Sequence, residues 1–159
     1  MTFTASKLFL CAVLLAGAGV VRAADTSPAT PAADDPLTPA RAQIAAKNWT
    51  GAIDELKRVN ATTSADWNNL MGYSHRKAKT PDYAAAEKFY DEALRIDPKH
   101  RGALEYSGEL YLIKGELAKA EQRLGVLDKV CFMPCEEYTD LKNALARYKA
   151  AGNKYVAKP

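Results

Sequence analysis

The sequence predicts an all-α protein built from stacked pairs of helices, and three observations support this prediction. Four columns of residues recur every 34 positions along the chain. Within each copy the four positions are spaced by three, four and three residues, which places them on one face of an α-helix. No stretch alternates between apolar and polar residues with a period of two, so we expect no sheet. A helix that repeats at this interval is typical of a stacked helical array. The columns comprise Trp49, Tyr83 and Leu117; Ala52, Ala86 and Ala120; Leu56, Tyr90 and Leu124; and Val59, Ala93 and Leu127.

Residues 1–23 have the features of a secretion signal. Lys7 supplies the positive start, residues 8–21 form an apolar run, and Ala23 is a small residue at the expected cleavage point. The apolar run is shorter than the ~20 residues that a membrane-spanning helix needs. We therefore expect an exported, periplasmic protein that begins at Ala24 and contacts a membrane only through the signal peptide before cleavage.

A flexible leader is expected over residues 24–36. It contains Ala, Asp, Thr, Ser and Pro, with almost no apolar side chain larger than Ala. So little apolar area cannot offset the entropy of ordering the chain. One helical domain is then expected over residues 37–151, followed by a flexible tail over 152–159.

The first three helices are predicted from their N-terminal capping residues. Thr38 is the expected N-cap of the first helix, with Pro39 at the first helical position, and that helix should run to about Lys47. Thr50 is the expected cap of the second helix. Ser64 is the expected cap of the third.

The next two helices have clear start and stop signals. Thr80 and Pro81 repeat the cap-then-proline signature, so they should open a fourth helix that ends before Pro98. A fifth helix is predicted from about Arg101 to the residue before Gly115.

The last two helices are amphipathic. A sixth is predicted over about residues 116–129. A seventh should follow Pro134 and end at Gly152, with Tyr138, Leu141, Leu145 and Tyr148 on one side and charged residues on the other.

Residues 38–130 resemble tetratricopeptide repeats. The family pattern has a glycine in the first helix of each pair, a small residue and an aromatic residue in the second helix, and a closing proline. One copy here has Gly72, Ala86, Tyr90 and Pro98, and the next has Gly108, Tyr111, Gly115, Ala120 and Leu124. The resemblance implies a short helical solenoid of antiparallel helix pairs, with the seventh helix as a C-terminal cap. It also implies close packing of Gly72 against Ala86 and of Gly108 against Ala120.

The resemblance further implies a groove that binds a partner protein. The first helices of such repeats line a concave face, where an extended peptide or a helix could bind. We expect the tyrosines to supply apolar contact and the charged residues to select the partner's orientation. Some family members clamp a C-terminal carboxylate with Lys, Asn and Arg, but the glutamates here depart from that clamp. The residues expected in the groove are Asn69, Tyr73, Arg76, Lys77, Glu105, Tyr106, Glu109 and Leu112. The alternative for the basic cluster over residues 75–79 is an ordinary solvated face.

Two cysteines remain after removal of the signal peptide, which contains Cys11. Cys131 and Cys135 are expected to form a disulfide, because an even pair in an oxidising compartment favours one. The alternative is a thiol-redox or copper-handling accessory protein, because two soft sulfurs close in sequence can exchange disulfides or bind Cu(I). A zinc site would need two more ligands.

Several function classes lack support in the sequence. The net charge of +3 would fall to +1 when Lys7 and Arg22 are removed with the signal peptide, so nucleic-acid binding is not expected. We find no phosphate-binding loop, nucleophile elbow or paired carboxylates, and expect no catalytic residue, cofactor or metal. His75 should pack in the fold and His100 should be solvated. We therefore predict a non-enzymatic protein-protein interaction module or scaffold in the periplasm.

Overall fold

The computed structural model describes residues 35–157, which form seven α-helices and contain no strand. The predicted all-α class is confirmed. The predicted signal peptide and residues 24–34 of the predicted leader lie outside the described residues. The helices are α1 (Thr38–Ala45), α2 (Trp49–Val59), α3 (Ala65–Lys77), α4 (Tyr83–Ile96), α5 (Arg101–Ile113), α6 (Leu117–Val130) and α7 (Glu136–Ala150).

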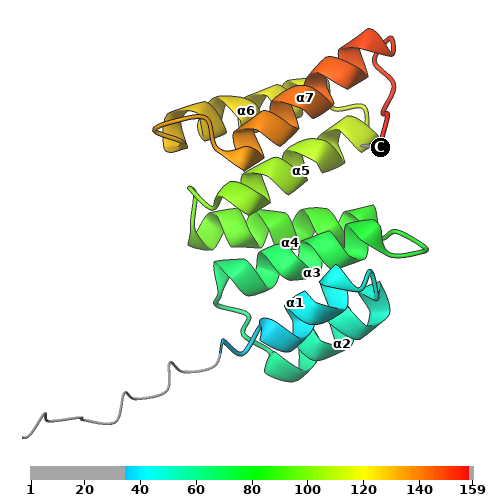
Figure 1. The fold of residues 1–159 in the computed structure, drawn as a ribbon, viewed down its shortest axis with the longest axis vertical. Coiled ribbons are helices and arrows are strands. Elements are labelled where there is room, and N and C mark those ends of the chain that lie inside the picture. The colour runs from blue at the N-terminus through cyan, green and yellow to red at the C-terminus, as the bar shows by residue number, and fades with distance from the viewer. Residues whose placement is uncertain (1–34, 158–159) are drawn as a thin grey trace, which may run out of the picture. The chain divides into compact units, whose positions relative to one another are not determined.

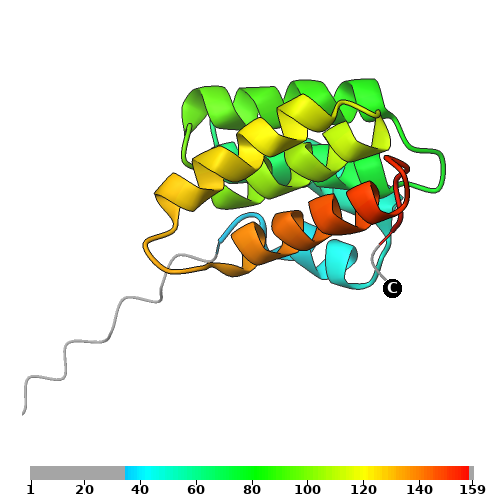
Figure 2. The ribbon, with the colours of Figure 1, turned by 90° about the horizontal axis from the view of Figure 1, so that it is seen from above.

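Successive helices run in opposite directions and pack as neighbours (Figure 1). Helices α1 and α2, α3 and α4, and α5 and α6 form pairs, and α7 packs against both α5 and α6. Further contacts join α1 to α3, α3 to α5, and α5 to α7, so the odd-numbered helices form one continuous layer. Seen from above, α4 and α6 lie on one side of the helical stack, and α7 lies on the opposite side of the stack (Figure 2). No helix of residues 35–157 is long and apolar enough to cross a membrane.

The predicted cap of α3 is confirmed, and the predicted cap of α1 is wrong. Ser64 caps α3, because its Oγ accepts a hydrogen bond from the Trp67 amide at 3.3 Å. Thr38 is not a cap. It is the first residue of α1, and the N-cap position belongs to Leu37, which is buried.

Two other predicted caps are wrong by two residues. Asn48, not Thr50, caps α2 by accepting from the Gly51 amide at 3.2 Å. Asp82, not Thr80, caps α4 by accepting from the Ala85 amide at 2.9 Å. In each case an Asn or Asp lies nearby and ranks at or above Thr as a capping residue.

The 34-residue columns form much of the core. The alanine column is fully buried in all three copies, and the columns that follow it are buried or half-buried. The column at the helix starts is less enclosed, and its Tyr83 is 36% exposed. Residues of the columns with no exposed surface are Ala52, Leu56, Ala86, Tyr90, Ala93, Ala120 and Leu127.

Two glycines allow close helix packing, Gly72 against the expected helix and Gly108 against a different one. A Cβ atom at Gly72 would lie 2.7 Å from the Tyr90 ring and 3.1 Å from the Ala86 carbonyl oxygen, so the expected approach to α4 is present. A Cβ atom at Gly108 would meet Leu141 of α7, 2.6 Å from its Cδ2. The nearest partner of Gly108 is therefore α7, and not Ala120 of α6.

Candidate partner-binding groove

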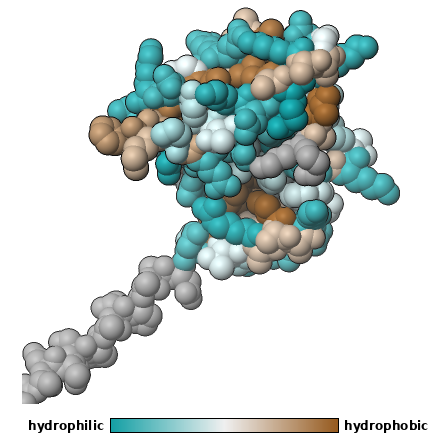
Figure 3. Space-filling model, turned by 45° about the horizontal axis from the view of Figure 1, so that its top comes forward, coloured by the Kyte–Doolittle hydropathy of each residue, from teal (hydrophilic) through white to brown (hydrophobic). Residues whose placement is uncertain are grey.

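A groove of about 200 Å³ lies between α3, α5, α7 and the segment that follows α7. Six of the eight residues expected at a partner-binding site line it, and we call it the α3–α5 groove. Its lining residues are Tyr73, Arg76, Lys77, Glu105, Tyr106, Glu109, Asp140, Tyr155 and Ala157. On the face shown in Figure 3, hydrophilic residues predominate and hydrophobic residues form small separate areas.

Aromatic side chains form one wall of the groove. The ring centroids of Tyr73 and Tyr106 lie 4.6 Å apart, and Tyr73 also contacts Trp49 of α2 edge-on at 5.8 Å. The guanidinium carbon of Arg76 lies 5.5 Å from the centroids of both tyrosine rings. This geometry is favourable for cation-π attraction and fixes the positions of the rings.

The positive charge of Arg76 is paired within the protein. Its Nη1 donates to Glu109 Oε2 at 2.7 Å, and the two side chains are only 3% and 15% exposed. Burial would lower the pKa of Arg76, but the Tyr90 hydroxyl and the Glu109 carboxylate raise it, so the guanidinium stays charged. Arg76 is therefore part of the groove's rigid wall and is neither a solvated surface charge nor a free contact for a partner.

Glu105 is the unusual residue of the groove. It is 7% exposed, and among the described residues no group donates a hydrogen bond to it or forms an ion pair with it. Burial raises the pKa of Glu105 to about 8, with further increases from the negative charges of Glu109, Asp140 and Glu137 and an opposing effect from Arg76. The carboxyl group is thus largely neutral at pH 7.

Two of the expected groove residues do not line it. Asn69 is 7% exposed and lies against Gly102 of α5. Leu112 has no exposed surface and belongs to the apolar cluster between α5, α6 and α7. Helix α7 packs along α5 and covers Leu112, so Leu112 cannot contact a partner.

Three groove residues were not predicted from the sequence. Asp140 lies on the polar face of α7, and the sequence predicted only a capping role for this helix. Tyr155 and Ala157 lie in the predicted flexible tail, and Tyr155 is 37% exposed. The signal that could have indicated this contact is the large apolar pair Tyr155 and Val156 in an otherwise small and polar tail.

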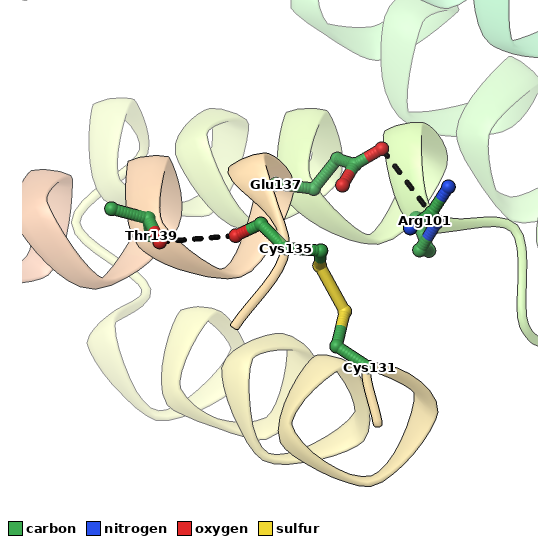
Figure 4. The surroundings of a disulfide bond; sticks show 5 residues. All are labelled: Arg101, Cys131, Cys135, Glu137 and Thr139. Carbon is green, nitrogen blue, oxygen red and sulfur yellow. Dashed lines mark hydrogen bonds and ion pairs between the residues drawn. A yellow bond between two sulfur atoms is a disulfide. The ribbon is translucent and has the colours of Figure 1, made fainter. Parts of the chain in front are cut away.

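The predicted disulfide is present between α6 and α7 (Figure 4). The Sγ atoms of Cys131 and Cys135 lie 2.07 Å apart, and Cys135 is the N-cap residue of α7. The loop between them exposes Phe132 and Met133 fully or largely to solvent. The bond therefore ties the end of α6 to the start of α7. The thiol-redox or copper-handling alternative stays a prediction.

The two histidines have packing and capping roles. The ring of His75 stacks on Phe89 with 5.5 Å between centroids, as expected for a packed residue. His100 is not a solvated turn residue, which corrects the prediction. Its Nδ1 accepts from the Ala103 amide at 3.1 Å and caps α5, and its Nε2 lies 2.8 Å from Asp66. Within residues 35–157 no group of three or more His, Cys, Asp or Glu residues is arranged to hold a metal ion.

Two comparisons with known proteins found no match. No protein-family model matches the chain. No curated protein matches it either.

Proposed function

We propose that this protein is a non-enzymatic binding module, a tetratricopeptide-like scaffold that holds a segment of a partner protein in the α3–α5 groove. One observation carries the proposal, namely the position of the chain's own C-terminal segment. Tyr155 and Ala157 line the groove together with Tyr73 and Tyr106. A groove that accepts a non-helical stretch of its own chain has the shape and the apolar contacts to accept a similar stretch of another protein.

The rigidity of the groove supports this mechanism. The Arg76–Glu109 ion pair and the contact between Tyr73 and Tyr106 position the wall before a partner arrives. A preformed site lowers the entropy cost of binding, because fewer side chains become ordered in the complex. The groove is small, so a transient interaction with a short segment fits it better than a large permanent interface.

The periplasm is the proposed location. A disulfide such as the one between Cys131 and Cys135 forms in oxidising compartments, which agrees with export. Mass measurement of the protein recovered from its native envelope tests the location. An N-terminus at Ala24 would support export with cleavage, whereas retention of residues 1–23 in the cytoplasm would contradict it.

A photo-crosslinking experiment tests the proposed function. A photoreactive amino acid is introduced in place of Lys77, which is exposed at the rim of the groove, and separately in place of Lys88 on α4 as a matched control. We expect Lys77 to yield an adduct with a discrete polypeptide in living cells, and Lys88 to yield no such adduct. Identical adducts from both positions, or none from Lys77, would contradict the proposal.

The same experiment separates the proposal from the alternative based on the cysteines. A Cys131→Ser/Cys135→Ser variant removes both sulfurs without touching the groove. A binding module should keep its Lys77 adduct in this variant. A redox or copper-handling protein should lose its function, with a mixed disulfide or bound copper detected in the unmodified protein.

A further inference from the structure

We infer that the α3–α5 groove selects partner segments with an uncharged carboxamide side chain, Asn or Gln, which forms two hydrogen bonds with the carboxyl group of Glu105. This partner chemistry rests on the proposed function and makes it more specific. Three features of the groove carry it: the burial of Glu105, which has no hydrogen-bond partner among the described residues; the balance of the charges around it; and the space that the groove leaves open.

Glu105 is a buried carboxyl group that lines the groove. It is 7% exposed, and among the described residues it neither accepts nor donates a hydrogen bond. Buried polar groups are nearly always hydrogen-bonded, because burial removes their bonds to water. The oxygen atoms of Glu105 are not sealed inside the protein, so a group that enters the groove can reach them. A ligand in the groove would therefore supply the missing hydrogen bonds.

The charges around Glu105 are balanced. Glu109 pairs with Arg76 at 2.7 Å, and Lys77 and Asp140, which have opposite charges, line the same groove. Neither a cationic nor an anionic side chain is thus favoured by electrostatic complementarity, because each would approach a group of its own sign. A neutral polar side chain meets no such repulsion.

The carboxyl group of Glu105 is mostly protonated at neutral pH. Burial raises its pKa to about 8, together with the negative charges of Glu109, Asp140 and Glu137 and against an opposing effect of Arg76. A protonated carboxyl group has an O–H donor and a carbonyl acceptor side by side. The carboxamide of Asn or Gln has a matching N–H donor and carbonyl acceptor in the same arrangement. The two planar groups can therefore form both hydrogen bonds at once.

The groove has room for a side chain of this size. Its volume is about 200 Å³ with the C-terminal segment in place, several times the ~30 Å³ that one water molecule occupies in the liquid. Tyr73 and Tyr106 on the helices and Tyr155 on the C-terminal segment line the same space. Their rings supply apolar surface for the methylene groups of Asn or Gln, while the carboxamide reaches Glu105.

Binding should weaken as the pH rises, because an ionised Glu105 has no O–H group to donate. With a pKa of about 8, the affinity of a carboxamide peptide should be about tenfold weaker at pH 9 than at pH 7. A basic ligand would show the opposite trend, since it requires the ionised carboxylate. The titratable and charged groups that face Glu105 are Tyr73, Arg76 and Lys77 of α3, Tyr106 and Glu109 of α5, Glu137 and Asp140 of α7, and Tyr155.

A display experiment with random peptides tests the inference on the full-length protein. The same library is selected against the unmodified protein, Glu105→Gln, Glu105→Leu, and Asp128→Leu as a control on the exposed surface of α6. Groove binders are the peptides that crosslink to a photoreactive amino acid at position 77. We expect Asn and Gln to be enriched with the unmodified protein, with Asp128→Leu and with Glu105→Gln, because the glutamine amide keeps one donor and one acceptor side by side. The enrichment should disappear with Glu105→Leu.

The other outcomes separate the inference from the proposed function. Groove peptides without enrichment of Asn or Gln, an enrichment lost in Glu105→Gln, or one that persists in Glu105→Leu would overturn the inference and leave the proposed function intact. No peptide that crosslinks at position 77 would overturn both. The affinity of the best peptide is then measured at pH 7 and pH 9. An affinity that stays constant or rises for the unmodified protein, or that falls equally for Glu105→Gln, would also contradict a carboxamide site at Glu105.

Discussion

Glu105 makes the stability of the protein sensitive to pH. Its pKa in the folded protein is raised to about 8 by burial and by the neighbouring carboxylates, whereas a glutamate in an unfolded chain has a pKa of about 4.3. Between these values the folded state binds more protons than the unfolded state. The contribution of Glu105 to stability is therefore full below about pH 4.3 and is lost as the pH rises toward 8.

The Glu105→Gln substitution should remove this pH dependence. The neutral amide keeps the shape of the side chain and cannot ionise. We expect the free energy of unfolding of the variant to exceed that of the unmodified protein at pH 9 by on the order of 2–4 kcal/mol, and to differ little at pH 4. Urea unfolding at both pH values, followed by circular dichroism, measures the effect. An equal difference at the two pH values would show that Glu105 is not buried as described.

The close contact at Gly72 should make even a methyl group costly. A Cβ atom there would lie 2.7 Å from the buried Tyr90 ring, so Gly72→Ala should lower the unfolding free energy by ~1–3 kcal/mol through overpacking. Gly125 of α6 is the matched control, because no atom lies within 4 Å of its added Cβ. Gly125→Ala should instead raise the unfolding free energy by ~0.5–1 kcal/mol, because alanine has a higher helix propensity than glycine. Thermal unfolding of both variants checks the opposite signs.

At the scale of the element, two substitutions at the start of α4 distinguish the observed cap, Asp82, from the cap expected from the sequence, Thr80. Asp82→Ala should cost ~1 kcal/mol, because it removes the acceptor for the Ala85 amide. Thr80→Ala should change stability by no more than about 0.5 kcal/mol, because Thr80 is exposed and precedes the helix. Chemical unfolding of the two variants distinguishes them. A larger loss for Thr80→Ala would favour the cap that the sequence alone indicated.

The junction of α6 and α7 depends on the disulfide. The Cys131→Ser/Cys135→Ser variant should lose about 2 kcal/mol of unfolding free energy, because the bond closes only a short loop in the unfolded chain. Unmodified protein treated with a reducing agent should show the same loss, which serves as an independent comparison. Complete unfolding of the variant at room temperature would mean that the disulfide stabilises much more of the protein than the junction of α6 and α7.

At the scale of the whole molecule, the C-terminal segment should compete with a partner for the groove. Tyr155→Ala should raise the affinity for a groove-binding peptide severalfold, because it weakens the internal occupant. Val156 is the matched control, since it is exposed and does not line the groove. Fluorescence titration with one labelled peptide compares the two variants. Equal affinities for Tyr155→Ala and Val156→Ala would show that the segment does not compete.

The candidate site could be predicted in part, because residue spacing along a helix is a local property. Tyr73 with Arg76, and Glu105 with Glu109, lie three or four residues apart, so each pair shares a helix face. Leu112 fits the same spacing but is buried, because α7 packs along α5 at that point. The path of α7 depends on contacts such as that between Gly108 and Leu141, which no local pattern reveals.

The sequence by itself determined the features that depend on short-range order. The 3.6-residue periodicity specified seven helices and their buried faces, and the spacing of the two cysteines allowed a disulfide. Only the tertiary structure decided which charges pair. Arg76 and Glu109 meet although they are 33 positions apart, and Glu105, one helical turn away from Glu109, is left without a partner. The physical reason is that two charges on different helices pair only when the rotation and the crossing of those helices place them within a few ångströms of each other. The packing of the whole core sets that rotation and crossing.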